Sequence, residues 1–272
     1  MNMPRVPQKY EAVDLEQRLE PDLEKGSEQS VIQAQPITQP LLTEITIINA
    51  DTPLIIRQNF ITKVYIILWF QLLVTSTFIA CCNQIKPLQK FMLSPGGQSI
   101  MWLCFVLSLV LTCSLLCLKT SIKKCPGSGL FLTLFTGSMT YIVGYAGIVY
   151  KLTTLLLAGM STLGIFSGLT LYAVQTKYDY TDKGGYLISL LMCFIIFGFM
   201  ISFVNLPVLS IVYSSVGSLI FSFYIVYDTQ MIVGGEHRRI KFHTDDYVIA
   251  AISLYLDIIN LFLYLLELLD GR

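Results

Sequence analysis

Charged residues are scarce in this sequence. Only 13% of its 272 residues are Asp, Glu, Lys or Arg, against about 25% in a typical soluble domain, whereas 54% are hydrophobic. Eighteen Lys and Arg balance eighteen Asp and Glu, so no basic excess indicates binding to nucleic acid. This composition excludes a water-soluble globular domain and predicts an integral membrane protein in contact with a lipid bilayer.

Disulfide and cofactor signatures are also missing. The seven cysteines are an odd number and most lie in apolar runs, where a secreted disulfide scaffold would not place them. The chain has no Gly-x-x-x-x-Gly-Lys-Ser/Thr phosphate loop, no His-Glu-x-x-His zinc motif and no Gly-x-Ser-x-Gly nucleophile elbow. We therefore expect neither an enzyme nor a bound cofactor.

The first 52 residues differ in composition from the rest. Acidic side chains outnumber basic ones there, Pro and Gln recur, and aromatic residues are nearly absent. Such a segment cannot bury enough apolar area to offset its loss of conformational entropy. We expect residues 1–52 to form a disordered cytosolic tail and residues 53–272 to form the transmembrane domain.

Long apolar runs follow from Ile61 onward, separated by short polar breaks. Each has about 20 residues, the length of helix that crosses a bilayer core. Backbone amides in lipid must bond within helices or a closed barrel, and barrel strands would be about half as long and alternate in polarity. The sequence therefore predicts an all-α seven-helix transmembrane bundle with spans at 61–82, 100–118, 129–150, 155–175, 184–204, 208–233 and 247–269.

Basic residues in the short loops predict the orientation, because Lys and Arg concentrate on the cytosolic side of membrane proteins. Most of them, including Lys123 and Lys124, fall on the same side as the N-terminal tail, whereas Lys86, Lys90 and Lys151 fall opposite. We expect a cytosolic N-terminus. Seven crossings would place the C-terminus on the other side, and a last helix that turned back would return it to the cytosol.

Two acidic residues lie inside the predicted spans. Asp228 is near the cytosolic end of the sixth span, and Asp257 is near the middle of the seventh. These spans are consecutive and therefore antiparallel, so both acids fall at similar depth and can meet in the bundle interior. A carboxylate at the bilayer centre costs about 2.5–3.5 kcal/mol on insertion scales, so an acid at this depth indicates a functional site.

Two facing carboxyls in a low dielectric cannot both ionise easily, so the pair would share one proton and titrate as a coupled unit. The same oxygens suit a hard cation such as Ca²⁺. The alternative is that each Asp bonds separately to Tyr227, Tyr255 or Asn260 and only helps the helices to pack. Because two acids lie on adjacent spans, we favour a pH sensor and ion gate at Asp228 and Asp257, with Ca²⁺ as ligand.

Other polar and small residues in the spans have simpler interpretations. Tyrosines near span ends, such as Tyr65 and Tyr264, are predicted to anchor the helices at the membrane interface. Glycines within the spans are predicted to allow close helix packing.

Presenilin-like intramembrane proteases also carry Tyr-Asp in the sixth span and Asp in the seventh, and a proton-sharing pair suits aspartyl hydrolysis. Their second Asp follows Gly-x-Gly and precedes Pro-Ala-Leu. Here Leu254-Tyr255-Leu256 precedes Asp257, and no Pro follows Pro207. The protease interpretation is therefore disfavoured.

Several segments resemble the transmembrane Bax inhibitor motif family, and two of them point to its lifeguard branch. The most specific lie at the C-terminal end. The segments are YDTQMIVGG (227–235), DYVIAAISLYLDIINLFLYLL (246–266), RQNFITKVYIIL (57–68) with QLLVT (71–75), and the lifeguard-like FTGSMTYIVG (135–144) and QTKYDYT (175–181).

The resemblance implies a bundle in which a central last helix is surrounded by the other six. It also implies a two-aspartate pH sensor, which matches Asp228 and Asp257. Some members latch this sensor with an Arg at the cytosolic end of the second span. Here only Lys119, Lys123 and Lys124 are present, and Lys lacks the bidentate fork of Arg.

The function implied is a pH-sensitive Ca²⁺ leak channel of intracellular membranes (endoplasmic reticulum, Golgi or endosome and lysosome) that lowers stored Ca²⁺ and inhibits apoptosis. Ca²⁺ would then be the permeant ion. The alternative is a membrane-embedded anti-apoptotic regulator that binds Bcl-2-type proteins or death receptors and conducts no ions.

Overall fold

Helices account for every regular element in the described part of the chain. The computed structural model describes residues 54–117, 128–203, 206–234 and 246–270. The predicted tail of residues 1–52 lies outside these ranges, as do Lys119, Lys123 and Lys124.

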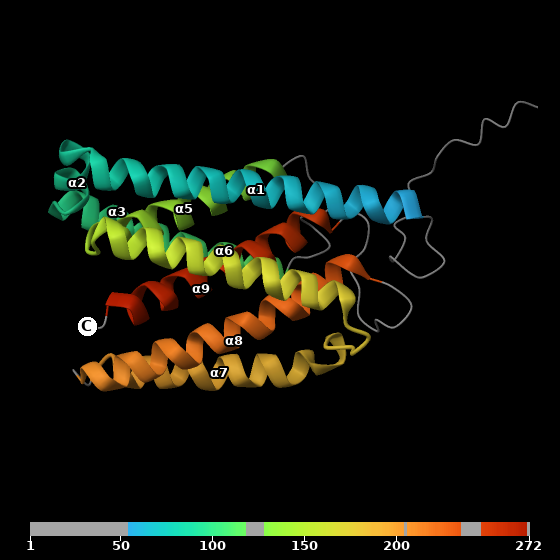
Figure 1. The fold of residues 1–272 in the computed structure, drawn as a ribbon. Coiled ribbons are helices and arrows are strands. Elements are labelled where there is room, and N and C mark those ends of the chain that lie inside the picture. The colour runs from blue at the N-terminus through green and yellow to red at the C-terminus, as the bar shows by residue number, and fades with distance from the viewer. Residues whose placement is uncertain (1–53, 118–127, 204–205, 235–245, 271–272) are drawn as a thin grey trace, which may run out of the picture. The chain divides into compact units, whose positions relative to one another are not determined.

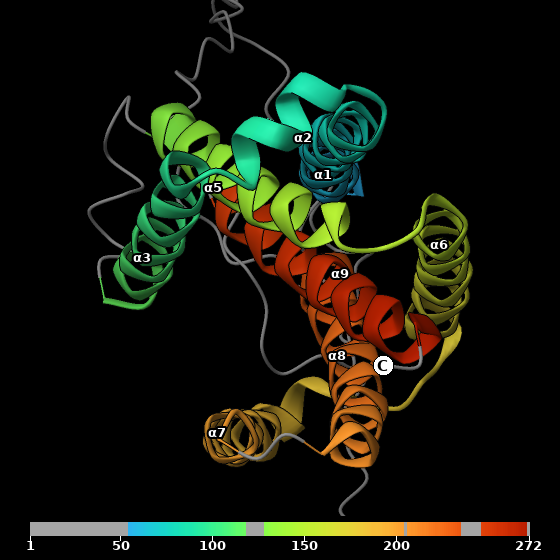
Figure 2. The same ribbon diagram turned by 90° about the vertical axis from the view of Figure 1, so that its left-hand side faces the viewer.

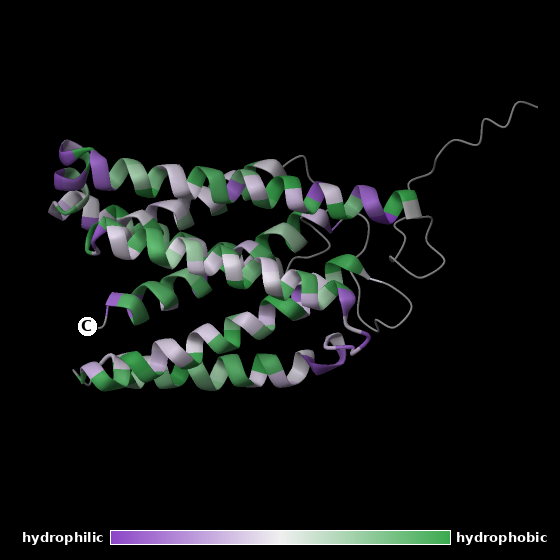
Figure 3. Ribbon diagram, viewed as in Figure 1, coloured by the Kyte–Doolittle hydropathy of each residue, from purple (hydrophilic) through white to green (hydrophobic). Residues whose placement is uncertain are grey.

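Seven helices within these ranges are long and apolar enough to cross a membrane, which confirms the predicted all-α, multi-span class. Apolar residues cover their lengths (Figure 3), because helices in lipid bond their own backbone and leave apolar side chains outside. The elements are α1 (Leu54–Gln84), α2 (Lys86–Met92), α3 (Pro95–Cys117), α5 (Ser128–Ile148), α6 (Leu152–Gln175), the 3₁₀ turn η1 (Thr181–Lys183), α7 (Gly184–Ile201), α8 (Pro207–Val233) and α9 (Tyr247–Asp270).

The first helix and the connection after it differ from the prediction. α1 begins at Leu54, before the expected start near Ile61. The prediction followed the apolar run and left out polar residues such as Arg57, which are nevertheless good helix formers. The short helix α2 is not in the prediction, since its seven residues are too few to span a bilayer. Pro87 lies in its first turn, where a missing backbone N–H costs nothing.

Successive spans run in opposite directions (Figure 1). α1, α5, α7 and α9 begin at one end of the bundle, which we name the Tyr247 end, and α3, α6 and α8 begin at the other, the Asp270 end. α9 is one uninterrupted helix that runs between these two ends. A last helix that turns back halfway is therefore not the arrangement observed.

α9 occupies the middle of the bundle (Figure 2). It packs against α1, α5, α6 and α8, whereas α3 packs chiefly against α5 and α7 against α8. In its most apolar 18-residue stretch 61% of the residues are buried, against at most 44% in the other six spans. The expected central helix is thus present, with α3 and α7 in an outer position.

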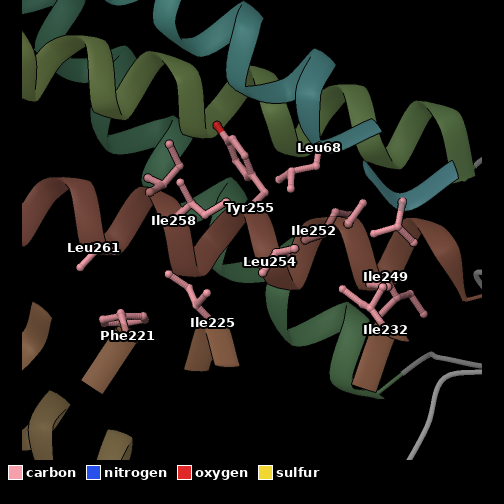
Figure 4. Packing of buried hydrophobic residues seen from close by; sticks show 14 of the residues in the cluster. Leu68, Phe221, Ile225, Ile232, Ile249, Ile252, Leu254, Tyr255, Ile258 and Leu261 are labelled. Carbon is pink, nitrogen blue, oxygen red and sulfur yellow. The ribbon is translucent and has the colours of Figure 1, made fainter. Parts of the chain in front are cut away.

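Small and apolar residues of α9 allow this position. Most of the residues between Val248 and Leu261 are buried, so they contact neighbours on several sides. Ala250 and Ala251 are fully buried and let neighbouring helices approach closely. Figure 4 shows Leu68 of α1 and Ile225 of α8 packed on different sides of α9.

Gly234 ends α8 with a backbone that other residues rarely adopt (φ 63°, ψ −156°), and its N–H donates to the carbonyl of Gln230 at 3.0 Å. We expect Gly234→Ala to lower the free energy of unfolding by about 1–3 kcal/mol, because a Cβ is strained in this region. The thermal midpoint in detergent measures this. Gly159→Ala in α6, where a Cβ meets nothing within 4 Å, is the control, and equal midpoints for both variants would contradict the expectation.

Candidate functional site

Asp228 and Asp257 lie together in the bundle interior. Asp228 is near the end of α8 and Asp257 near the middle of α9, and these two helices pack along their lengths. Only 7% of Asp228 and 6% of Asp257 is exposed. Their carboxyl groups face each other closely enough to interact directly. The structure thus brings the two acids of the sequence together.

A hydrogen bond between two carboxyls needs a proton. An ionised carboxylate only accepts hydrogen bonds, so at least one of the two groups must be protonated to donate. Two ionised carboxylates at this distance in a low dielectric would repel each other. A direct contact between the two carboxyls is therefore stable only while the pair holds a proton, and its attraction is lost when that proton leaves.

Oxygens without partners lie beside the pair. The Oδ2 of Asp257 and the hydroxyl of Tyr224 are buried and have no hydrogen-bond partner among the described residues. Tyr224 lies one helical turn before Asp228 on the same face of α8. Buried polar atoms normally find partners, so these oxygens are available to a proton or cation that reaches the pair.

Tyr255 and Asn260 bond elsewhere. The hydroxyl of Tyr255 pairs with Thr75 Oγ1 at 2.8 Å, and Figure 4 shows this side chain on the side of α9 away from α8. The Nδ2 of Asn260 donates to the carbonyl of Leu256 in its own helix at 2.8 Å. The expectation that these two residues support the aspartates through hydrogen bonds is wrong, because positions around Asp257 on a helix face different neighbours.

Tyr227 also serves another contact. Its hydroxyl sits against Gly184 at the start of α7, where an added Cβ would lie 2.6 Å from that oxygen. Tyr227 therefore fixes the packing of α7 on α8. Among the described residues, no hydrogen bond joins Asp228 or Asp257 to Tyr227, Tyr255 or Asn260, which does not favour the interpretation that these neighbours satisfy each Asp separately. Lys123 and Lys124, the other expected supports, lie outside the described residues.

A second buried polar cluster joins α1, α5 and α9. Gln71 Nε2 donates to Thr136 Oγ1 at 2.9 Å, and Thr75 Oγ1 lies 3.0 Å from Thr140 Oγ1 and 2.8 Å from the Tyr255 hydroxyl. Sequence reasoning missed this cluster. The available signal was a pair of polar residues four positions apart on each of two spans, which places each pair on one helix face.

We expect Thr75→Val to lower the free energy of unfolding by about 1–2 kcal/mol, since it keeps the shape of the side chain but removes the hydroxyl that links three helices. Denaturant titration in detergent micelles measures this. Thr133→Val on the exposed face of α5 is the matched control and should change little. A loss of stability no larger than that of the control would mean that the cluster does not stabilise the bundle.

Gln230 is fully buried two residues after Asp228 and binds the segment between α6 and α7. Its Oε1 accepts from the backbone N–H of Tyr180 at 2.8 Å, and its Nε2 donates to the carbonyls of Tyr178 at 3.0 Å and Ala173 at 3.4 Å. The end of α8 that carries Asp228 is thereby tied to the connection between two other spans.

The aspartate pair suits a passing cation better than a resident one. Ca²⁺ takes about 6–8 oxygen ligands, whereas the pair offers two carboxylates. Across the described ranges, no group of three or more His, Cys, Asp or Glu side chains could hold a metal ion. A cation at the pair would therefore keep much of its water.

Comparison with known proteins identifies the family. Residues 57–272 match the family described as "Inhibitor of apoptosis-promoting Bax1". The chain belongs to this Bax inhibitor family. It is 32% identical over 221 residues to Protein LIFEGUARD 1 of Arabidopsis thaliana, which covers 79% of this chain and 90% of that protein. It is 27% and 28% identical over 221 residues to Protein lifeguard 3 of Mus musculus and Homo sapiens, covering 80% of this chain and 70% of each relative.

These relatives confirm the lifeguard branch of the Bax inhibitor family, to which the sequence motifs pointed. The matched region of the family includes both aspartates, Tyr224 and Gln230, and it begins only at Arg57. The chain is therefore a multi-pass membrane protein whose membrane domain carries the family features.

Proposed function

We propose that this protein is a pH-sensitive Ca²⁺ leak channel of intracellular membranes, which lowers stored Ca²⁺ and thereby inhibits apoptosis. The observation that carries the proposal is the buried contact between the carboxyls of Asp228 and Asp257. The description of the family as an inhibitor of apoptosis-promoting Bax1 supports the protective role.

The proton on the pair controls the contact between α8 and α9. While it is present, the two carboxyls attract each other and hold the helices together. When it leaves, two buried negative charges repel, and they separate or are bridged by a divalent cation. Proton and Ca²⁺ compete for the same oxygens, so each lowers the occupancy of the other. The leak therefore rises as pH rises through the titration of the pair.

The Tyr247 end of the bundle faces the cytosol in this proposal. Lys63, Lys177 and Lys183 lie toward that end, whereas Lys86 and Lys90 lie at the Asp270 end, in keeping with the excess of basic residues in cytosolic loops. Asp228 lies in the last turns of α8 at the Tyr247 end, so the pair responds to cytosolic pH.

Purified protein in liposomes loaded with Ca²⁺ tests the proposal. We expect Ca²⁺ efflux above that of empty liposomes, and we expect it to rise with pH. Deletion of residues 2–50 should leave this efflux unchanged, because both aspartates lie in the helical domain. Absence of efflux at every pH would contradict the channel.

The same deletion separates the channel from a regulator that binds Bcl-2-type proteins or death receptors through its tail. If protection of cells from apoptosis is lost while the efflux of the deletion variant is intact, partner binding is the protective activity. If both persist, Ca²⁺ release is sufficient.

A further inference from the structure

Four aromatic rings close the seam between α8 and α9 on the Asp270 side of the aspartate pair. They belong to Phe194 of α7, Tyr213 and Phe221 of α8, and Tyr264 of α9, and we name them the ring cluster. The Tyr264 ring lies 5.5 Å from that of Phe194, 5.8 Å from that of Tyr213 and 5.7 Å from that of Phe221, between centroids. Phe194 stacks on Tyr213 at 4.2 Å.

A glycine makes room for this cluster. A Cβ at Gly217 would lie 2.8 Å from the Phe194 ring and 2.9 Å from the Tyr264 ring, so both rings enter the seam only because position 217 has no side chain. Tyr264, predicted as an interface anchor, instead packs its ring inside the bundle, and the neighbouring Tyr213 hydroxyl donates to the carbonyl of Phe194 at 3.5 Å.

Buried polar groups lie beside the ring cluster and between it and the aspartates. On α8, Ser214, Phe221, Tyr224 and Asp228 are spaced so that they share one helix face. The Oγ of Ser214 is fully buried without a hydrogen-bond partner among the described residues, as is the Tyr224 hydroxyl beyond the rings. The seam thus passes from the aromatic rings, which enclose Ser214, to a polar site at Tyr224 and the aspartates.

An acid lies at the outer side of the rings. Glu267 follows Tyr264 by three residues on α9, so it lies on the same helix face about one turn closer to the Asp270 end. Glu267 is therefore close to the ring cluster on the side toward the Asp270 end. A carboxylate at the mouth of a low-dielectric passage concentrates cations there.

We infer that cations travel along the α8–α9 seam, that the ring cluster is the gate on the Asp270 side, and that Glu267 draws divalent cations to this gate. The inference rests on the proposed function, since it names the path that leads to the aspartate pair. Closely packed rings exclude water from the closed seam, and hydrophobic constrictions of this kind gate channels. The faces of tyrosine rings also attract cations, so the rings do not repel an ion once they part.

Two variants in planar bilayers test the gate. We expect Tyr264→Ala to raise the Ca²⁺ current under conditions in which the wild type is least active, because the central ring of the cluster is gone. Tyr186→Ala on the exposed side of α7 is the matched control and should leave the current unchanged. We expect Glu267→Gln, which keeps the size of the side chain, to lower the permeability of Ca²⁺ relative to K⁺, measured from the reversal potential, on the order of tenfold.

The outcomes separate the gate from the channel itself. Suppose that the wild type conducts Ca²⁺, but that Tyr264→Ala has the wild-type Ca²⁺ current or Glu267→Gln has the wild-type reversal potential. The proposal of a gate at the ring cluster is then wrong, and the proposed function stands. If the wild type conducts no Ca²⁺, the proposed function fails and the gate with it. If Tyr264→Ala does not fold, Glu267→Gln alone tests the proposal. A purely structural role for Glu267 would leave the reversal potential unchanged.

Discussion

Asp257→Asn is expected to give a Ca²⁺ leak that is low and independent of pH. The side-chain amide of Asn donates a hydrogen bond to the carboxylate of Asp228 without needing a shared proton, so the contact between α8 and α9 persists at every pH. In the wild type, release of one proton opens the contact, and the leak changes by up to about tenfold per pH unit across the titration. Efflux from liposomes between acidic and alkaline pH measures the difference.

Asp228→Asn should behave in the same way, because the hydrogen bond can be donated from either side of the pair. Asp182→Asn in the exposed turn before α7 is the control for the chemical change and should keep the wild-type profile. A pH dependence that survives in both buried variants would remove the aspartate pair from the mechanism.

Gln230→Ala is expected to cause the largest loss of stability among the variants considered, about 2–4 kcal/mol. The substitution removes the side-chain partner of the Tyr180 N–H and of the Tyr178 carbonyl in a fully buried place, and it leaves a cavity at the end of α8. The free energy of unfolding in detergent, from denaturant titration, measures this effect.

Gln175→Ala at the exposed end of α6 is the matched control, since it removes the same amide from the surface. Because Gln230 holds α8 near Asp228, its loss should also broaden the pH profile of the leak. A Gln230→Ala protein as stable as the control variant would show that these hydrogen bonds contribute nothing net.

The arrangement of the spans could be predicted from the sequence because lipid imposes one simple rule, that about 20 apolar residues form a crossing helix. The meeting of Asp228 and Asp257 was also accessible, since consecutive spans must be antiparallel and both acids lie at similar depth. Helix α2 was not accessible from hydropathy, because its seven residues lie outside any apolar run of crossing length.

The partners of individual polar residues could not be predicted, since they depend on how each helix is rotated about its axis. Tyr255 and Asp257 are two positions apart and face different helices, so one joins a cluster with Thr75 while the other pairs with Asp228. Tyr264 is similar, because its place near a span end suggested an interface whereas Gly217 opens an interior site for its ring. Such details follow from helix packing and not from local sequence.

Infrared spectroscopy of the protein in lipid would test directly whether Ca²⁺ displaces the proton that the carboxyls of Asp228 and Asp257 share. We expect a band from protonated carboxyl groups at acidic pH that disappears as the pH rises. When Ca²⁺ is present, the band should disappear at a lower pH. The double variant Asp228→Asn, Asp257→Asn should lack the band. A band that is unchanged in the double variant, or whose pH dependence ignores Ca²⁺, would contradict the exchange.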